Sequence, residues 1–208
     1  MFGKQMESEE LALTMTSSAV EHEEPSSRTD SAQALERAMA GDRAAFDELI
    51  LCFERRVFRT AWRLLGSKED AQDAAQEVFL RLYRHLRRVD PKRPLLPWLY
   101  RITVNVCHDM RRKRRWDTML PEEPGTATVA IDPTGEITRV EQKRVIAEAL
   151  KTLTEKERAA IILRDIEGLS TAEVASTLGS SETTIRSQIS TGRVKIRKFV
   201  DRMEKRRS

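Results

Sequence analysis

Four polar side chains between residues 70 and 77 have the spacing of one helix face: Asp70, Asp73, Gln76 and Glu77. Side chains three or four residues apart are neighbours on a helix surface. Grouped carboxylates can bind a metal ion or act as acid and base, and His85 and His108 follow in the sequence. No HExxH spacing or other known ligand pattern accompanies them. The sequence therefore favours a face that is solvated or docks on a basic partner over a metal-dependent hydrolase, and it predicts no metal and no cofactor.

A second group of side chains suits the binding of a polyanion. The stretch RITVNVCHDMRRKRRW, residues 101–116, begins with apolar residues at helical spacing and continues into five consecutive cations: Arg111, Arg112, Lys113, Arg114 and Arg115. Clustered cations attract nucleic acid because they replace the counterions of its phosphates. We expect one helix, with a packed apolar part and a basic end that meets DNA.

The segment LSTAEVASTLGSSETTIRSQISTGRVKIRK, residues 169–198, has the layout of a helix-turn-helix. In such a unit the second helix lies in the major groove and its N-terminal residues reach base edges. An ordinary three-helix bundle with a solvated face shows a similar pattern, but the basic outer face favours DNA binding. The residues expected to face DNA are Thr183, Thr184, Arg186, Ser187 and Ser190, with Arg193 and Lys195 nearer the phosphates.

Helices must position all of these side chains. Aromatic residues make up only 5% of the chain and charged residues 34%, so the core must come from aliphatic stripes on amphipathic helices. Such stripes recur from Ser31 to Leu65 and from Ser67 to Leu86. In the second half, two capping boxes open short helices, Thr154 with Glu157 and Ser170 with Glu173. The predicted fold class is all-α, with two small helical domains joined by a flexible linker.

Charge and composition divide the chain further. Residues 1–30 hold seven acidic and two basic side chains, a net charge of −5, which leaves +9 for the remainder of a chain whose total is +4. We expect residues 1–30 to be a disordered acidic extension, residues 117–135 to be the proline-containing linker and residues 201–208 to be a basic tail. Neither a signal peptide nor a membrane span is evident, which favours a cytoplasmic protein.

The two cysteines, Cys52 and Cys107, lie within apolar helical patterns and show no CxxC spacing. We expect both to be small core residues in the reduced state.

Three stretches in this order carry a resemblance to a known family: DAQDAAQEVFLRLYRHL, WLYRITVNVCHDMRRKRR and LTEKERAAIILRDIEGLSTAEVASTLGSSETTIRSQIS. They resemble the bacterial RNA polymerase sigma factors of the extracytoplasmic-function group, over residues 31–115 and 136–200. The resemblance implies that residues 31–116 form a region 2 domain, which binds core polymerase and recognises and melts the −10 element. It implies that residues 136–200 form a region 4 helix-turn-helix domain, which recognises the −35 element.

The resemblance also assigns roles to residues. It places core polymerase binding on Asp70, Asp73, Gln76, Glu77 and Phe79. It places −10 recognition on Trp98, Tyr100, Arg101, Asn105, Asp109, Arg111, Arg112, Lys113, Arg114 and Arg115. Trp98 is also spaced to anchor its helix in the core. It places recognition of the −35 element on the helix-turn-helix residues named above.

The implied function is promoter recognition and opening for core RNA polymerase, with no catalysis and no small-molecule substrate. The implied partners are core RNA polymerase, promoter DNA and an anti-sigma factor. The alternative is a stand-alone helix-turn-helix regulator. Two departures from the family pattern are Gln188, commonly arginine, and Ser-Thr-Gly-Arg at 190–193, commonly Ser-Arg-Ala-Arg. We expect the loss of two cations to weaken phosphate binding, and Gly192 to lower helix stability by up to about 1 kcal/mol relative to alanine.

Overall fold

The computed structural model describes residues 25–117 and 137–207, and within these ranges every regular element is a helix. Near the ends of the ranges only the backbone is described. The first half contains α2 (Pro25–Met39), α3 (Arg43–Leu65), α4 (Lys68–His85), the short 3-10 helix η1 (Leu86–Arg88) and α5 (Leu95–Asp117). The second half contains α6 (Ile137–Lys151), α7 (Glu155–Ile161), the π-helical turn η2 (Ile162–Ile166), α8 (Thr171–Leu178) and α9 (Glu182–Arg207). The predicted all-α fold class is confirmed.

Local signals in the sequence set the helix boundaries of the first half. The Asp42 carboxylate caps α3 by accepting a hydrogen bond from the backbone N–H of Ala45 at 3.2 Å. Gly66 ends α3 in the left-handed conformation, with φ of 79°, which costs glycine little because it has no Cβ. The next residue, Ser67, then caps α4.

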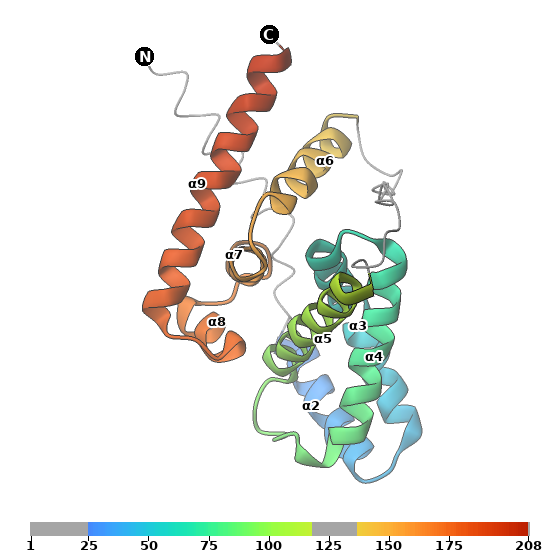
Figure 1. The fold of residues 1–208 in the computed structure, drawn as a ribbon. Coiled ribbons are helices and arrows are strands. Elements are labelled where there is room, and N and C mark those ends of the chain that lie inside the picture. Colours follow the sequence, from blue (N-terminus) through green and yellow to red (C-terminus); the bar gives the residue numbers. More distant parts are fainter. Residues whose placement is uncertain (1–24, 118–136, 208) are drawn as a thin grey trace.

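The first half is a bundle in which α3 packs against α2, α4 and α5 (Figure 1). The predicted stripes form its core, because Leu49, Phe53 and Val57 of α3 and Ala74 and Val78 of α4 are all at most 1% exposed. The bundle therefore fixes the relative orientation of the acidic helix α4 and the basic helix α5.

Both predicted capping boxes of the second half are present. Thr154 and Glu157 exchange hydrogen bonds at the start of α7, and Ser170 and Glu173 do so at the start of α8. The turn between α8 and α9 begins at Gly179, with φ of 60°. The hydroxyl of Ser181 then accepts a hydrogen bond from the N–H of Thr184 and caps α9. These short-range contacts build the helix-turn-helix.

Three expectations differ from the structure, and a fourth falls largely outside the described residues. Helix α2 begins at Pro25, so residues 25–30 are helical where disorder was expected. Helix α9 runs to Arg207, through most of the expected tail. Residues 1–24 and most of the expected linker lie outside the described residues. Cys107 is buried as expected, but Cys52 is exposed on α3, because its position falls on the solvent side of the stripe formed by Leu49 and Phe53.

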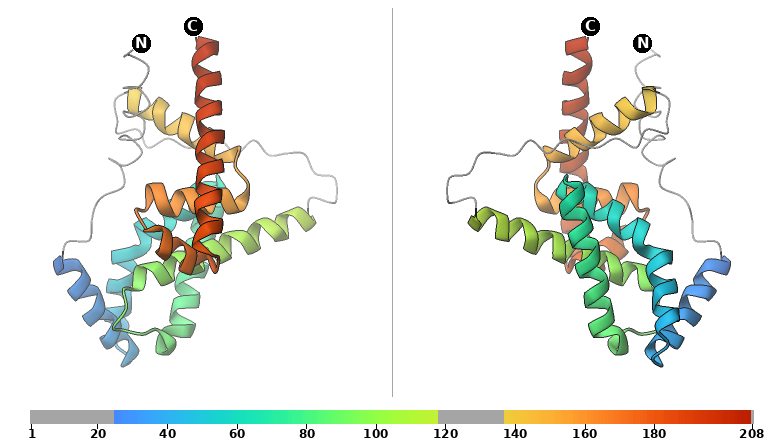
Figure 2. Two further views of the ribbon diagram at one scale, coloured as in Figure 1. Left: turned by 90° about the vertical axis from the view of Figure 1, so that its left-hand side faces the viewer. Right: turned by 90° about the vertical axis from the view of Figure 1, so that its right-hand side faces the viewer.

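The two halves contact each other. Helix α5 packs against α8, and α3 packs against α7 and η2. Figure 2 shows α5 crossing the molecule near α8, and the C-terminal part of α9 extending away from the body. No helix among the described residues is long and apolar enough to cross a membrane.

Candidate docking and nucleic-acid interfaces

The acidic face of α4 is partly open to solvent. Asp73 and Gln76 are exposed, and the partly buried Glu77 accepts a hydrogen bond from Arg81 at 2.8 Å, one turn along the helix. Asp70 is less accessible: its Oδ1 accepts a hydrogen bond from Nη2 of Arg114 at 2.8 Å, and its Oδ2 lies 2.7 Å from Nη1 of the same guanidinium. The acidic face is thus tied to the basic end of α5, and Asp73 and Gln76 are the members that are open to a partner.

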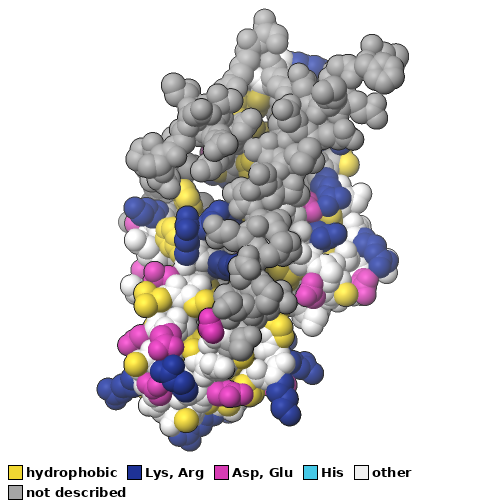
Figure 3. Space-filling view, turned by 180° about the vertical axis from the view of Figure 1, so that it is seen from behind, with side chains coloured by type: hydrophobic (Ala, Val, Ile, Leu, Met, Phe, Trp, Pro, Cys, Tyr) yellow, Lys and Arg dark blue, Asp and Glu magenta, His cyan; other side chains and the backbone are white. Residues whose placement is uncertain are grey.

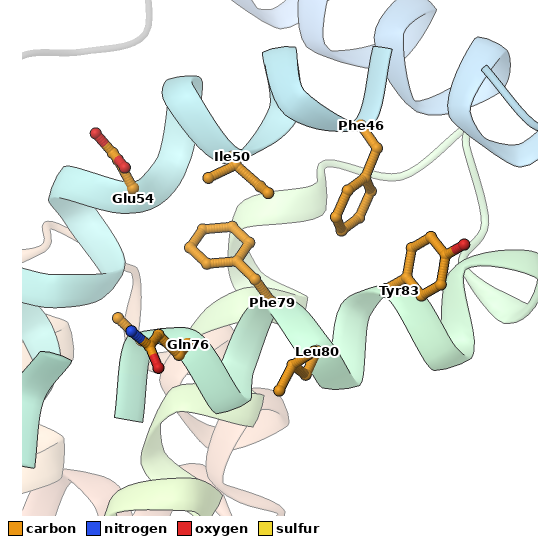
Figure 4. A pocket seen from close by; sticks show the side chains of 8 residues that line it. Phe46, Ile50, Glu54, Gln76, Phe79, Leu80 and Tyr83 are labelled. Carbon is orange, nitrogen blue, oxygen red and sulfur yellow. The ribbon is translucent and has the colours of Figure 1, made fainter. Parts of the chain in front are cut away.

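An apolar groove lies beside this face, between α3 and α4 (Figure 4). It has a volume of about 460 Å³. The ring of Phe79 points toward Ile50, and the rings of Phe46 and Tyr83 meet edge to face with centroids 5.2 Å apart. The side chains that line it are those of Phe46, Ile50, Glu54, Ala75, Gln76, Phe79, Leu80 and Tyr83. Gln76 and Phe79, both predicted to bind polymerase, therefore share one surface.

Large apolar side chains are exposed around the groove. Of the side chains that line it, Tyr83 is 57% exposed and Leu80 is 50% exposed. Figure 3 shows apolar side chains among acidic and basic ones on the back of the molecule. Exposed apolar groups that gather at a groove mark a protein-binding surface. The family motif did not include Leu80 and Tyr83. Both are large apolar residues that fall outside the buried stripe of α4, and this position in the sequence could have marked them as exposed.

The solvent face of α5 carries the polar residues predicted to meet the −10 element. Arg101, Asn105 and Arg112 are exposed and Asp109 is half-buried; their spacings of four, four and three residues place them on one side of the helix. Asp109 lies 3.5 Å from the Arg112 guanidinium and 3.7 Å from that of Arg81. This face can therefore offer both an amide and guanidinium groups to a nucleic acid.

The basic end of α5 is divided between solvent and protein. Lys113 and Arg114 are exposed. Arg111 is half-buried, and its guanidinium lies 4.0 Å from the carboxylate of Glu155 in α7. The side chain of Arg115 lies outside the described residues.

The two aromatic residues predicted for the −10 element are turned inward. Trp98 is half-buried and packs against the core. Tyr100 is 1% exposed, and its hydroxyl donates a hydrogen bond to Glu167 of the second half at 2.6 Å. Burial, together with the nearby Glu167 carboxylate, raises the pKa of Tyr100, so the phenol stays protonated and serves as the donor. In this conformation Tyr100 is not accessible to DNA.

The N-terminal part of α9 presents a continuous polar surface. Its exposed side chains are Thr183, Thr184, Arg186, Ser187 and Ser190. Ile185 and Ile189 of the same turns are buried, and they fix this helix face toward solvent. Arg186 also pairs with Glu182 one turn earlier, at 2.7 Å.

Arg193 and Lys195 make ion pairs within the second half. The guanidinium of Arg193 binds both oxygens of Asp165, at 2.5 and 3.0 Å, and this hydrogen bonding raises the pKa of Arg193. The Lys195 ammonium lies 2.8 Å from both oxygens of Glu157, whose side chain is only 11% exposed. Both cations thus hold α9 to neighbouring elements, a role that the sequence pattern did not suggest.

A basic groove of about 720 Å³ runs along α9. Its cationic lining residues are Arg164, Arg186, Arg193, Arg197 and Lys198. A row of cations beside an exposed polar helix start has the layout of a DNA-binding surface. Among the described residues, no group of three or more His, Cys, Asp or Glu side chains is arranged to hold a metal ion.

Together the fold and these surfaces define a class of protein: an all-helical DNA-binding factor built from two domains. The comparisons agree. Residues 49–117 match the model of sigma-70 region 2, and residues 143–196 match that of sigma-70 region 4. The chain therefore belongs to the sigma-70 family, within the extracytoplasmic-function group, and is a sigma factor rather than a stand-alone regulator.

Individual relatives support the same assignment. The chain is 39% identical over 167 residues to the sigma factor SigE of Mycolicibacterium smegmatis, covering 77% of this chain and 64% of that relative, just under two thirds of its length. It is 31% identical over 170 residues to SigM of Mycobacterium tuberculosis, covering 81% and 84%. Its fold resembles that of CnrH, solved in complex with the cytosolic domain of CnrY, with a TM-score of 0.63, 25% identity and coverage of 83% and 97%.

Proposed function

We propose that this protein binds core RNA polymerase, directs it to promoters with specific −10 and −35 elements, and helps to open them. The observation that carries the proposal is the joining, in one chain, of an open acidic and apolar docking face with two basic DNA-binding elements. The protein catalyses no reaction of its own in this role. Its place of action is the cytoplasm, where bacterial polymerase meets DNA.

The docking step uses α4. Asp73 and Gln76 are open to solvent and supply polar contacts to a basic partner surface. The groove beside them supplies apolar area, through Phe79, Leu80 and Tyr83. Apolar groups at the centre of a protein interface contribute most of its affinity, whereas charges at its rim contribute mainly to association rate and specificity. We therefore add Leu80 and Tyr83 to the predicted polymerase-binding residues.

The opening step uses α5. An unpaired base must be held after losing a few kcal/mol of stacking energy. Polar side chains in line with a cationic track can hold the separated strand. Arg101 and Asn105 lie on the same side of α5 as Arg112, about three and about two helical turns before it. Asn105 provides the sequence preference, because amide groups can form specific hydrogen bonds with base edges. The cations supply affinity for any sequence.

The −35 step uses α9. Thr183, Thr184 and Ser187 at its start face solvent and suit base contacts, and Arg186 suits a base or a phosphate. Arg193 is held by Asp165, so it approaches DNA as an oriented cation. Lys195 is the more deeply embedded, through Glu157, and its contribution to phosphate binding is the smallest of the set.

A protein inhibitor is the third proposed partner. Members of this group are commonly controlled by anti-sigma factors, and the similar CnrH was solved with the cytosolic domain of a second protein. The groove between α3 and α4, with Leu80 and Tyr83 exposed, suits an apolar helix of such a partner. An inhibitor bound there would compete directly with polymerase.

The substitution Asp73→Arg tests the docking assignment. Asp73 is exposed, so the change reverses a surface charge without disturbing the core. We expect binding to core polymerase to weaken at least tenfold, about 1.4 kcal/mol, as measured by surface plasmon resonance with immobilised core enzyme. Circular dichroism and the unfolding transition should match those of the original protein.

The matched control is Glu36→Arg, which makes the same charge change on an exposed position of α2, away from the groove. It should bind polymerase with unchanged affinity. Full binding by Asp73→Arg, or equal loss in both variants, would remove α4 as the docking helix.

A further inference from the structure

Asp70 forms an ion pair between the acidic helix α4 and the basic helix α5. It lies in the first turn of α4, and Arg114 lies near the end of α5, 44 residues further along the chain. The Oδ1 atom of Asp70 accepts a hydrogen bond from Nη2 of Arg114 at 2.8 Å, and Oδ2 lies 2.7 Å from Nη1. Two parallel contacts of this kind fix the plane of a guanidinium as well as its position. The pair therefore sets the direction in which the Arg114 side chain points.

The low exposure of Asp70 does not suit a docking contact. Its side chain is 14% exposed, whereas Asp73 and Gln76 of the same helix are open to solvent. The Asp70 carboxylate is directed at α5, which packs against α4 (Figure 1). A partner protein that binds this carboxylate would have to replace Arg114. Membership of the acidic motif therefore does not by itself make Asp70 a polymerase contact.

Arg114, in contrast, is accessible to a large ligand. Its side chain is 66% exposed, and it follows the exposed Arg112 and Lys113 at the basic end of α5. A guanidinium carries five N–H donors in one plane, and Asp70 contacts only the edge formed by Nη1 and Nη2. Arginine also keeps its charge at physiological pH. The Arg114 guanidinium can thus contact Asp70 and a phosphate at the same time.

The ion pair contributes little to holding the two helices together. Helices α4 and α5 already pack against each other, and both supply core residues, such as Val78 of α4 and Val106 of α5. An ion pair with an exposed member adds little to folding stability, because solvent screens it and its side chains lose freedom. The pair does restrict Arg114, and a long side chain that is already ordered loses less entropy when it binds a ligand. We therefore expect the pair to affect binding more than folding.

The same arrangement occurs on the other helix expected to meet DNA. Arg193 of α9 is 59% exposed, and its guanidinium donates to both oxygens of Asp165 in η2, whose side chain is 16% exposed. The ion pairs of Arg112 and Arg186 instead join residues one turn apart in a single helix, and their carboxylates are 46% exposed. In both halves, a largely buried aspartate of a neighbouring element thus holds an exposed arginine of a DNA-binding helix.

We propose that Asp70 is a positioning residue for DNA binding rather than a contact for core polymerase. It orients the guanidinium of Arg114 toward the phosphates that the basic end of α5 meets. The proposal rests on the proposed function, because it takes α5 as a DNA-binding helix. It moves one acidic residue of the family motif from the protein interface to the nucleic-acid interface, and Asp73 and Gln76 remain the polar docking residues of α4.

Asp70 also has an electrostatic effect of the opposite sign, because its negative charge repels a phosphate. At about 150 mM salt the Debye length is about 8 Å, so repulsion across the width of the guanidinium is weakened. The direct contact between Asp70 and Arg114, at 2.8 Å, is screened much less. Positioning should therefore outweigh repulsion at this salt concentration. The two effects predict opposite results when the charge of Asp70 is removed: loss of repulsion strengthens DNA binding, and loss of orientation weakens it.

The test variant is Asp70→Asn, which keeps the shape, removes the charge and places an amide N–H₂ against the guanidinium. The matched control is Glu69→Gln, which removes an equal charge from the same helix turn; Glu69 is exposed and its carboxylate bonds to Ser67. Arg114→Gln and the double variant Asp70→Asn/Arg114→Gln complete a cycle.

Three quantities are measured for each variant of the chain. The affinity for core polymerase is measured by surface plasmon resonance. The affinity of the resulting complex is measured, at about 150 mM salt, for a DNA fragment that contains one of its transcription start sites. The midpoint of thermal unfolding reports on the fold.

We expect Asp70→Asn to bind core polymerase with unchanged affinity and the promoter fragment roughly three- to tenfold more weakly. Arg114→Gln should lose at least as much promoter affinity. The double variant should bind the promoter no more weakly than Arg114→Gln, because Asp70 acts through Arg114. Glu69→Gln should keep its promoter affinity, and its unfolding midpoint should match that of Asp70→Asn. A purely structural role for Asp70 would instead give a loss that follows the unfolding midpoint and persists without Arg114.

Three results would overturn the proposal. Weaker binding of Asp70→Asn to core polymerase would return Asp70 to the docking interface. Equal or tighter promoter binding by Asp70→Asn would show that Asp70 does not orient a DNA contact. A further loss from Arg114→Gln to the double variant would show that Asp70 does not act through Arg114. Failure of the complex to start at any specific site would contradict the proposed function instead, and the affinities for core polymerase would still decide whether Asp70 is a docking contact.

Discussion

Gly192 shows how a residue that is unfavourable for its own helix can serve the packing between helices. A Cβ at this position would lie 2.9 Å from Cγ1 and 3.3 Å from Cδ1 of Ile161. Ile161 is fully buried in α7 and has little room to move. The glycine that the sequence marked as a source of lower helix stability therefore allows α9 to approach α7 closely.

We expect Gly192→Ala to destabilise the protein. Alanine gains up to about 1 kcal/mol in helix propensity, but overpacking a buried contact costs roughly 1–3 kcal/mol. The free energy of unfolding in urea should fall by up to about 2 kcal/mol. The neighbouring exposed Thr191 provides the control, because Thr191→Ala adds helix propensity without a clash and should leave stability equal or higher. Higher stability in Gly192→Ala would show that α9 can shift away from α7 freely.

The two cysteines should differ in reactivity. Burial raises the pKa of the Cys107 thiol to about 12, and the thiolate is the reactive form, whereas Cys52 is exposed. In the folded protein, a disulfide reagent at neutral pH should react promptly with the thiol of Cys52 and at least about 100-fold more slowly with that of Cys107. Cys52→Ser should remove the fast phase. A fast phase that persists in Cys52→Ser would mean that α5 opens readily around Cys107.

Individual helices could be predicted well from the sequence. The capping residues Ser67, Thr154 and Ser170 and the stop signal Gly66 act within a few residues of their partners, so the sequence contains the whole interaction. The π-helical turn at Ile162–Ile166 was not predicted. Its apolar spacing resembles that of an ordinary helix, so the local sequence pattern does not report the extra residue in this turn.

Helix α5 should contribute a measurable number of phosphate contacts. Each contact that releases counterions adds about 0.9 to the slope of log affinity against log salt. Arg112 and Lys113 are exposed at its basic end. We measure the affinity of the complex of this protein and core polymerase for a promoter fragment between roughly 50 and 200 mM salt. The double variant Arg112→Gln/Lys113→Gln should lower the magnitude of the slope of log affinity against log salt by about 2.

The control for this measurement is Lys151→Gln, at an exposed cation of α6 that pairs with Glu148 within its own helix. It should leave the slope unchanged. An unchanged slope in the double variant would take the basic end of α5 out of the DNA interface.

At the scale of the whole molecule, the sequence predicted the two domains but not their contact. Glu167 meets residues that are 67 to 107 positions away in the chain, and no local pattern reports such pairing. The same limit applies to Lys195, whose cationic type suggested phosphate binding and whose ammonium is paired with Glu157 in the structure. The motif predicted to bind polymerase lies within α4 alone and was visible in the sequence, whereas the groove is formed by residues of both α3 and α4.

The central claim is that this chain gives core RNA polymerase the ability to start at specific promoters. It is tested most directly by transcription in vitro with core enzyme, the purified chain and a library of bacterial genomic fragments, followed by sequencing of transcript 5′ ends. We expect discrete start sites that require the chain, share −10 and −35 sequences, and disappear with Asp73→Arg. Start sites no different from those of core enzyme alone, at chain concentrations where both proteins form a complex, would contradict the claim.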